Sequence, residues 1–448
     1  MAGSWNIMNK TLSGAYINVR SIAQLEREFQ GREGVLALPF PLEFGDLVST
    51  ITLNDLVTDA SLGKIGLSLR NSDKDIVKYM IQAFKGAQEL IIFNSNVGGN
   101  KASGVIGGIT VTATKAGLGG NEIAISVVAV GNKWEVKVFY EGNLVDTQIV
   151  AQEADLKDNQ FVVFGAVTNF AAAAATKLTS GSNGSADLSD YITEVANKNP
   201  SLIFLESISS TELTEIERIL ENGNKIRVLV GDAFGGSGLV ATELDNEYIS
   251  YIKPDGFVDG KGANVDKDIC YFVAGQSAGA GRSSSLTYSV IPFIAGSTEP
   301  APSISDLEDL SKTGAMVIHQ RFNGDYVLER DRNTLKTFTA EKASVFSDNK
   351  VLRVLIDIHD EIRNNFEMNY LGKVQNHDNG RVQFKGDVVK YVSALEAEGS
   401  VEDFDSTTDV VVSKGNDIWS MRCDLYIQVT GTLEKLYMEV FVSDRGGI

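Results

Sequence analysis

The segment MRCDLYIQVT, residues 421–430, alternates apolar and polar side chains along its whole length. A second segment, LYMEVFV at residues 436–442, repeats this alternation shortly before the end of the chain. A period of two is typical of a β-strand with one buried face, so both segments are predicted to be strands. The apolar side chains of the first segment should share that buried face; they are Met421, Cys423, Leu425, Ile427 and Val429.

Strand-like segments occur at both ends of the chain. The C-terminal one comprises Leu436, Tyr437, Met438, Glu439, Val440, Phe441 and Val442, and the N-terminal one comprises Ala15, Tyr16, Ile17, Asn18 and Val19. Two strands alone are marginally stable in water, and a terminal strand leaves an unpaired edge unless something covers it. We therefore predict an assembly protein whose subunits exchange strands. Residues 421–430 would belong to the subunit's own sheet and accept the two terminal segments of neighbours.

Length and charge narrow the class of protein. A chain of 448 residues is long enough for two to four domains with buried cores. With 40 basic and 59 acidic residues the net charge is −19, which disfavours binding to nucleic acid and to anionic membranes. The first ten residues lack the pattern of a signal peptide, and no apolar run approaches the roughly 18 residues of a membrane helix. Cys270 and Cys423 are predicted to be reduced core residues of a chain made in the cytoplasm.

The pattern predicts a multidomain α/β protein. An α/β core domain, residues 21–96 plus 182–335, would be interrupted by an all-β, sandwich-like insertion at 97–181. An α+β C-terminal domain would span 336–432, with arms at 1–20 and 433–448 as extended strands. Continuous apolar runs in the core predict strands covered on both faces, joined by helices. These strands include 34–38, 89–94, 201–206, 225–231, 268–274 and 314–320.

One motif points to an enzyme. Residues 275–279 read GQSAG, the G-x-S-x-G pattern of an α/β hydrolase nucleophile, after a predicted strand. Asp306 or Asp309 and then His319 follow in the order that such an enzyme uses. However, the sequence AGRSSS that follows is a poor start for the required helix. A structural Gly/Ser loop is therefore favoured, and a hydrolase using Ser277 with His319 remains the alternative.

No other pattern predicts a cofactor or metal site. The three histidines lack the spacing of metal ligands, and no glycine cluster continues as a phosphate-binding loop. The predicted helix 349–370 carries mixed charges, which indicates either a solvated face or a docking face for a charged partner. The charges considered for docking are Arg353, Asp357, Asp360, Glu361 and Arg363.

Several segments resemble the tail sheath proteins of contractile phage tails and phage-like bacteriocins. The most specific are VLRVLIDIHDEIR at 351–363, YLGKVQN at 370–376 and the stretch 380–391. GAYI at 14–17 resembles the family's N-terminal arm, with Ser13 in place of the usual proline. Residues 274–288 resemble an Ala-Gly…Ser-Leu-Thr-Tyr segment of the family, which makes the serine motif structural, and 116–122 resembles a turn of its β insertion.

The resemblance implies a structural subunit without enzymatic activity or cofactors. Sheath subunits form stacked hexameric rings around a tail tube, linked by terminal arms, and contract to drive the tube through a target envelope. The implied partners are other copies of the chain, the tube protein, and baseplate and terminator proteins, with neither nucleic acid nor membrane. The resemblance places assembly in the bacterial cytoplasm and the product in a phage or bacteriocin tail. A non-contractile structural assembly protein remains a second alternative.

Overall fold

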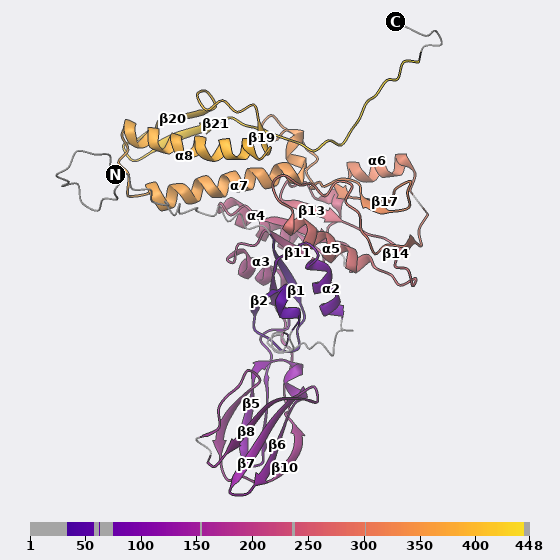
Figure 1. Ribbon diagram of the computed structural model, residues 1–448, viewed down its shortest axis with the longest axis vertical. Helices are drawn as coiled ribbons and strands as arrows, with labels where there is room; N and C mark the ends of the chain where they lie inside the picture. Colours follow the sequence, from indigo (N-terminus) through magenta and orange to yellow (C-terminus); the bar gives the residue numbers. More distant parts are fainter. Residues whose placement is uncertain are drawn as a thin grey trace, which may run out of the picture. The chain divides into compact units, whose positions relative to one another are not determined.

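The computed structural model describes residues 34–57, 62, 75–152, 155–234, 238–300 and 302–442 (Figure 1). The predicted N-terminal arm, including Ala15 to Val19, lies outside the described residues. The fold is mixed α/β, with several sheets and helices.

A seven-stranded sheet forms the centre of the α/β region. In spatial order its strands are β16 (Ala315–Met316), β13 (Ile249–Ile252), β12 (Arg227–Gly231), β11 (Leu202–Leu205), β1 (Val35–Phe40), β3 (Glu89–Asn94) and β2 (Val48–Thr52). All neighbouring pairs are parallel except β2 with β3. The predicted strand 314–320 is interrupted, because Val317 separates β16 from β17 (Ile318–Gln320).

Both faces of this sheet are buried, as the continuous apolar runs predict. On one face, α2 (Asp75–Ala83) and α5 (Asp266–Gly279) pack against side chains such as Leu36 and Leu90. On the other face, α3 (Leu188–Ala196) and α4 (Ser210–Glu221) pack against the alternate side chains of the same strands. Successive side chains of each strand therefore point into two separate hydrophobic cores, one on each face of the sheet.

The predicted strand at 268–274 is wrong, because these residues lie in α5. The helix lies between the sheet and α2, so residues around its whole circumference, such as Ile269, Cys270 and Tyr271, are buried. A helix that is apolar on all sides has no helical periodicity to distinguish it from a buried strand. The 14-residue length of this element, which exceeds that of a typical strand and identifies a helix, becomes visible only in the structure.

Residues 101–177 form two antiparallel sheets with one shared core. One sheet contains β4 (Lys101–Ile106), β5 (Ile109–Ala116) and β9 (Val162–Val167). The other contains β10 (Ala173–Lys177), β6 (Ile123–Val130), β7 (Lys133–Tyr140) and β8 (Asn143–Val150). The division of the chain into domains stays a prediction.

Short elements connect the larger ones. Two small antiparallel pairs are β14 (Phe257–Val258) with β15 (Gly296–Ser297), and β17 with β18 (Tyr326–Leu328). The remaining helices of this region are η1 (Leu53–Val57), η3 (Leu118–Glu122), η5 (Ala241–Glu243), α6 (Ile304–Lys312) and η6 (Ser344–Ser347).

The C-terminal region combines two long helices with two short sheets. Helix α7 (Asn349–Asn365) begins where the Asp348 side chain accepts hydrogen bonds from the N–H groups of Lys350 and Val351. The predicted helix 349–370 changes character after Asn365, because η7 (Phe366–Tyr370) is a π-helical turn. Helix α8 (Asp378–Ala397) and four strands complete the region: β19 (Val401–Glu402), β20 (Val410–Lys414), β21 (Met421–Leu425) and β22 (Gln428–Val429).

The predicted strand 421–430 is divided into β21 and β22 at Tyr426 and Ile427. The first part pairs with β20 and the second with β19, both antiparallel. The partner therefore changes partway along the strand, at the loop that joins β19 to β20.

Candidate assembly interface

The alternating segment at 421–430 partly buries the face that its sequence predicts. Its apolar side chains pack against the C-terminal core, which includes Val354, Phe384 and Val392. They are Met421, Cys423, Leu425, Ile427 and Val429. The face is kept through the interruption at residues 426–427, so one long strand serves both short sheets.

One edge of this long strand has no partner strand among the described residues. The N–H of Tyr426 donates to the carbonyl of Asp409, and the N–H of Thr430 donates to that of Ser400. In an antiparallel ladder alternate residues direct both backbone groups at the partner. Even-numbered residues therefore point toward β20 and β19. Odd-numbered residues, from Met421 to Val429, direct their backbone groups at the opposite, open edge.

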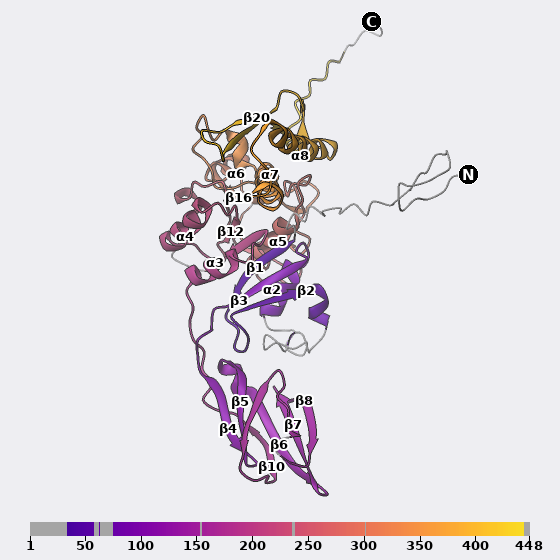
Figure 2. The same ribbon diagram turned by 90° about the vertical axis from the view of Figure 1, so that its left-hand side faces the viewer.

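The segment after β22 runs outward in extended form and pairs with no strand of the described subunit (Figures 1 and 2). The described part of the predicted arm 433–448 is residues 433–442, which we call the C-terminal arm. Its large apolar side chains are almost fully exposed: Leu436 is 85% exposed, Phe441 88% and Val442 90%. The predicted strand 436–442 is thus not formed within the subunit. Exposed apolar runs of this kind mark interaction sites in soluble proteins.

The root of the arm is tied to the body of the subunit. The Lys350 ammonium group donates to the carbonyl of Thr430 and, at 3.0 Å, to its hydroxyl, while that hydroxyl donates to the Gly399 carbonyl at 2.6 Å. Four residues later, the Glu434 carboxylate lies 3.3 Å from Nε of Arg330 and accepts a hydrogen bond of 3.2 Å from the Thr287 hydroxyl. These contacts fix where the arm leaves the subunit.

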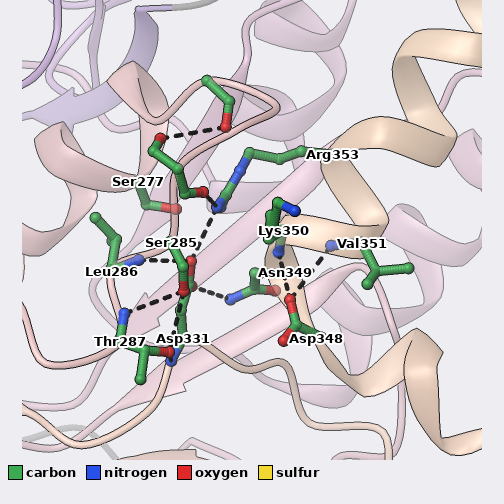
Figure 3. A network of polar contacts seen from close by, with 12 residues as sticks. Ser277, Ser285, Leu286, Thr287, Asp331, Asp348, Asn349, Lys350, Val351 and Arg353 are labelled. Atoms are coloured by element: carbon green, nitrogen blue, oxygen red, sulfur yellow. Dashed lines mark hydrogen bonds and ion pairs between the residues drawn. The ribbon is translucent and has the colours of Figure 1, made fainter. Parts of the chain in front are cut away.

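Beneath this root lies a buried polar network centred on Asp331, which is fully buried (Figure 3). The carboxylate accepts hydrogen bonds from Asn349 Nδ2 at 2.8 Å, from the Leu286 N–H at 3.1 Å and from Arg353 Nη2 at 3.0 Å. Its own N–H donates to the Thr287 hydroxyl, the group that also holds Glu434. The network therefore joins α7, the 284–287 loop and the arm root.

Electrostatics keep Asp331 ionised. Burial alone would raise the pKa of its carboxyl, but the positive charge of Arg353 and the hydrogen bonds from Asn349 and Leu286 hold that pKa below its ordinary value. The Arg353 guanidinium also donates to the Ser284 carbonyl at 2.6 Å, while its Nε and Nη1 have no hydrogen-bond partner among the described residues. The Asp331–Arg353 ion pair is thus buried, and two of the guanidinium nitrogens lack a hydrogen-bond acceptor among the described residues.

This network corrects the prediction that Arg353 belongs to a docking face of the helix, which the resemblance would direct at the tail tube. That side chain is 6% exposed and paired with Asp331, so it is excluded from any exposed docking face in this structure. Asp357 is also engaged within the subunit, with Arg282 at 2.6 Å and the Tyr391 hydroxyl at 2.8 Å. The other residues of the set are Asp360, Glu361 and Arg363 on the following turns of α7, and their contact with a tube stays a prediction.

The serine motif is structural. Ser277 is 3% exposed within α5, where it accepts a hydrogen bond of 3.2 Å from Arg227 Nη1. The proposed partners of a catalytic serine are engaged elsewhere. His319 lies 3.1 Å from Glu329, Asp306 caps α6 with Ser303, and Asp309 pairs with Lys312. The predicted Gly/Ser loop is likewise wrong, because the motif lies inside a helix.

The two glycines of this motif allow α5 and α2 to approach closely. A Cβ on Gly275 would lie 2.0 Å from the Ala83 carbonyl oxygen, and one on Gly279 would lie 2.1 Å from that of Gly86. Any side chain at either position would collide with the backbone. The i, i+4 spacing of the glycines therefore serves helix packing.

The described part of the chain shows neither a metal-binding cluster nor a membrane helix. No group of three or more His, Cys, Asp or Glu residues is arranged there to hold a metal ion. Likewise, none of the helices in those ranges combines the length and apolarity needed to span a bilayer.

Comparisons with known proteins identify a family, relatives and solved structures that this chain resembles. Residues 341–443, which run from the start of the C-terminal region through the arm, match the phage tail sheath C-terminal domain family. The protein XkdK of the phage-like element PBSX of Bacillus subtilis (strain 168) is 23% identical over 97% of this chain and 98% of its own. The sheath tail protein of Desulfitobacterium hafniense is 26% identical, with a TM-score of 0.75, over 95% of this chain and 99% of that chain.

A more distant structure shares the fold. The anti-feeding prophage helical sheath in its contracted state has a TM-score of 0.51 at 11% identity, over 97% of this chain and all of that chain. The match over residues 341–443 and the likeness to the Desulfitobacterium hafniense sheath tail protein support a structural, non-enzymatic role like that of a tail sheath protein. They confirm the resemblance to contractile tail sheath proteins that the sequence predicts.

Proposed function

We propose that this chain is the subunit of a contractile tail sheath whose subunits are linked by strand exchange. One observation supports this proposal most strongly. The same subunit has both an apolar arm exposed to solvent and a strand edge without a partner strand among the described residues. The arm of one subunit would add to the open edge of 421–429 in the next, with Leu436, Met438 and Val440 facing the core. The N-terminal segment 15–19 would be a second strand lent to a neighbour.

The energetics favour such a joint. A donated segment of this length would form about four to eight backbone hydrogen bonds, each contributing a net ~1 kcal/mol. Burial of each large apolar side chain adds roughly 1.5–3 kcal/mol. Main-chain pairing at a sheet edge also gives a link that can hinge, as in other strand-addition complexes. Such a joint would hold subunits together while their rigid bodies rearrange.

The contact is heterologous, because the arm of one copy meets a different surface on the next. Contacts of this kind propagate into rings or helical polymers. We propose stacked hexameric rings around a tail tube, with Asp360, Glu361 and Arg363 as candidate tube contacts. The sheath would contact baseplate and terminator proteins at its ends. Contraction would draw on interfaces that differ between two states and would drive the tube through a target cell envelope.

The subunit would be made in the bacterial cytoplasm and would function in a phage or bacteriocin tail, without a cofactor and without binding nucleic acid or a membrane. The net charge of −19 supports the last point, because it disfavours polyanions and anionic lipids.

Electron microscopy of the purified protein in negative stain tests the proposed function. We expect thick hollow tubes with a cogwheel-like cross-section, since a sheath subunit polymerises through its own arms. A protein that stays monomeric at high concentration would contradict sheath assembly. Smooth tubes of a single fixed length and diameter under all conditions would instead favour a non-contractile assembly protein.

A further inference from the structure

The arm of each subunit could also pair within its own chain. The open edge ends at Val429 and the alternating segment begins at Leu436, so the six residues 430–435 could turn the arm back along its own edge. This connection is one residue longer than the commonest hairpin loops, which have two to five residues. Such a hairpin would bury the arm's apolar face and close the edge. A subunit closed in this way could neither donate its C-terminal arm nor accept one at this edge.

The described structure shows the arm held away from this hairpin. The side chain of Glu434 is 19% exposed and is held by Arg330 and Thr287, which lie 104 and 147 positions before it in the sequence. Lys350, at the start of α7, holds the Thr430 carbonyl. Beyond these contacts the arm continues outward instead of turning back along β21 (Figures 1 and 2).

Basic residues predominate around Glu434 in a chain that is acidic as a whole. Glu434 lines a cavity of about 600 Å³. The other charged residues of its lining are Lys312, Arg330, Arg332, Lys336 and Asp348. Burial, and then the charge of Arg330, lower the pKa of Arg332. With four basic residues against one other carboxylate, and with Arg330 3.3 Å away, the cavity favours the Glu434 carboxylate over a solvent-exposed hairpin loop.

We propose that Glu434 is a positioning residue that prevents self-closure. Its seat in the basic cavity fixes the root of the arm on the subunit body, and the arm is therefore presented to a neighbour. The proposal rests on strand donation as the proposed function. It adds that the choice between self-pairing and exchange is set by one ion pair and one hydroxyl contact.

The substitution Glu434→Gln tests this role, with Glu217→Gln as the matched control. Both variants remove one negative charge, but Glu217 is exposed on α4, outside the arm and outside the cavity. Light scattering should show polymerisation slowed about tenfold in Glu434→Gln, the effect of losing one charge-assisted contact. Glu217→Gln should polymerise at the wild-type rate.

Hydrogen exchange of the monomer, below the concentration at which it polymerises, provides the second readout. In Glu434→Gln the amides of Met421, Cys423 and Leu425 should become protected, because the arm then pairs with its own edge. The double variant Glu434→Arg/Arg330→Glu, which restores an ion pair of opposite sense, should regain exchange and polymerisation toward wild type.

Two outcomes separate this inference from the proposed function. Wild-type polymerisation and unchanged edge exchange in Glu434→Gln would overturn the positioning role while leaving strand donation intact. Normal polymerisation of a chain that lacks residues 433–448 would overturn strand donation itself.

Discussion

Deletion of residues 433–448 is expected to abolish polymerisation while leaving a folded subunit. The arm makes few contacts with its own subunit, chiefly those of Glu434 with Arg330 and Thr287. Its apolar side chains are 70–103% exposed, so the folded core loses little when they are removed. Every proposed joint made by the C-terminal arm, however, loses its donated strand. Circular dichroism should report wild-type folding, and electron microscopy should show no tubes.

A matched pair of point variants tests whether the apolar face of the arm, and not merely the presence of residues 433–448, is needed for polymerisation. Met438→Lys places a charge on the face predicted to be buried, whereas Glu439→Lys changes the opposite face. An unpaired charge buried at the joint costs several kcal/mol, so Met438→Lys should prevent tubes and Glu439→Lys should permit them. Equal behaviour of the two variants, or tubes from the deleted chain, would refute the arm's role.

Asp331→Ala is expected to destabilise the subunit by about 3–5 kcal/mol, because it leaves the buried Arg353 charge without its partner. It also removes acceptors from Asn349 and from the Leu286 N–H. Urea unfolding followed by circular dichroism should show a lower midpoint. Asp360→Ala is the matched control, because Asp360 is 38% exposed on the same helix and its loss should change stability by less than about 1 kcal/mol.

Removing both charges together should cost less than removing Asp331 alone. In Asp331→Leu/Arg353→Met no uncompensated charge remains, and apolar replacements of buried ion pairs are often neutral or stabilising. A double variant as unstable as Asp331→Ala would show that packing, and not charge, holds α7 to the 284–287 loop.

The same pair predicts a pH dependence. Because the pKa of Asp331 is lowered in the folded state, its contribution to stability is fully present above the ordinary aspartate value of about 3.9. That contribution should decrease as the pH falls through the lower folded value. The Asp331→Asn variant should therefore lose less stability than wild type between pH 4 and pH 2, in unfolding curves measured at each pH.

Local patterns in the sequence predict many of the elements. The strands β1, β3 and β11 follow from apolar runs, and the buried face of 421–430 follows from alternation alone. The helix α5 does not, since burial on all sides removes the periodicity that identifies a helix. The interruption at residues 426–427 is equally invisible, because it reflects a change of partner strand and not a change in side-chain pattern.

The sequence predicts only part of the proposed assembly interface. Period-two alternation indicates the C-terminal arm and the segment 421–430, whose roles as donor and acceptor strands stay predictions. It gives no signal for Glu434, Arg330 or Thr287, whose contacts join positions 104 or 147 residues apart. The sequence also predicts the wrong environment for Arg353. A charged residue on a helix is expected to be exposed, and only the structure shows its buried partner Asp331. Long-range polar pairing is thus the part that sequence patterns did not supply.

Cysteine cross-linking tests strand exchange most directly, and the chain supplies one half of the pair. Cys423 lies on β21, part of the proposed acceptor strand, and the other cysteine, Cys270, is fully buried. Opposite residues on paired strands have Cα atoms about 5.5 Å apart, within the range that a disulfide spans. Burial raises the pKa of the Cys423 thiol, so oxidation should be carried out at alkaline pH.

Each variant carries one introduced cysteine and is oxidised after assembly. The test positions are 436, 438, 440 and 442, and the control positions are the intervening residues 437, 439 and 441. If subunits exchange strands, one of the first four positions should give a ladder of covalent multimers under denaturing, non-reducing conditions. The ladder should disappear when Cys423 is replaced by serine. The intervening positions should give none. Cross-linked species that remain monomeric, or multimers that form equally at all seven positions, would contradict strand exchange between subunits.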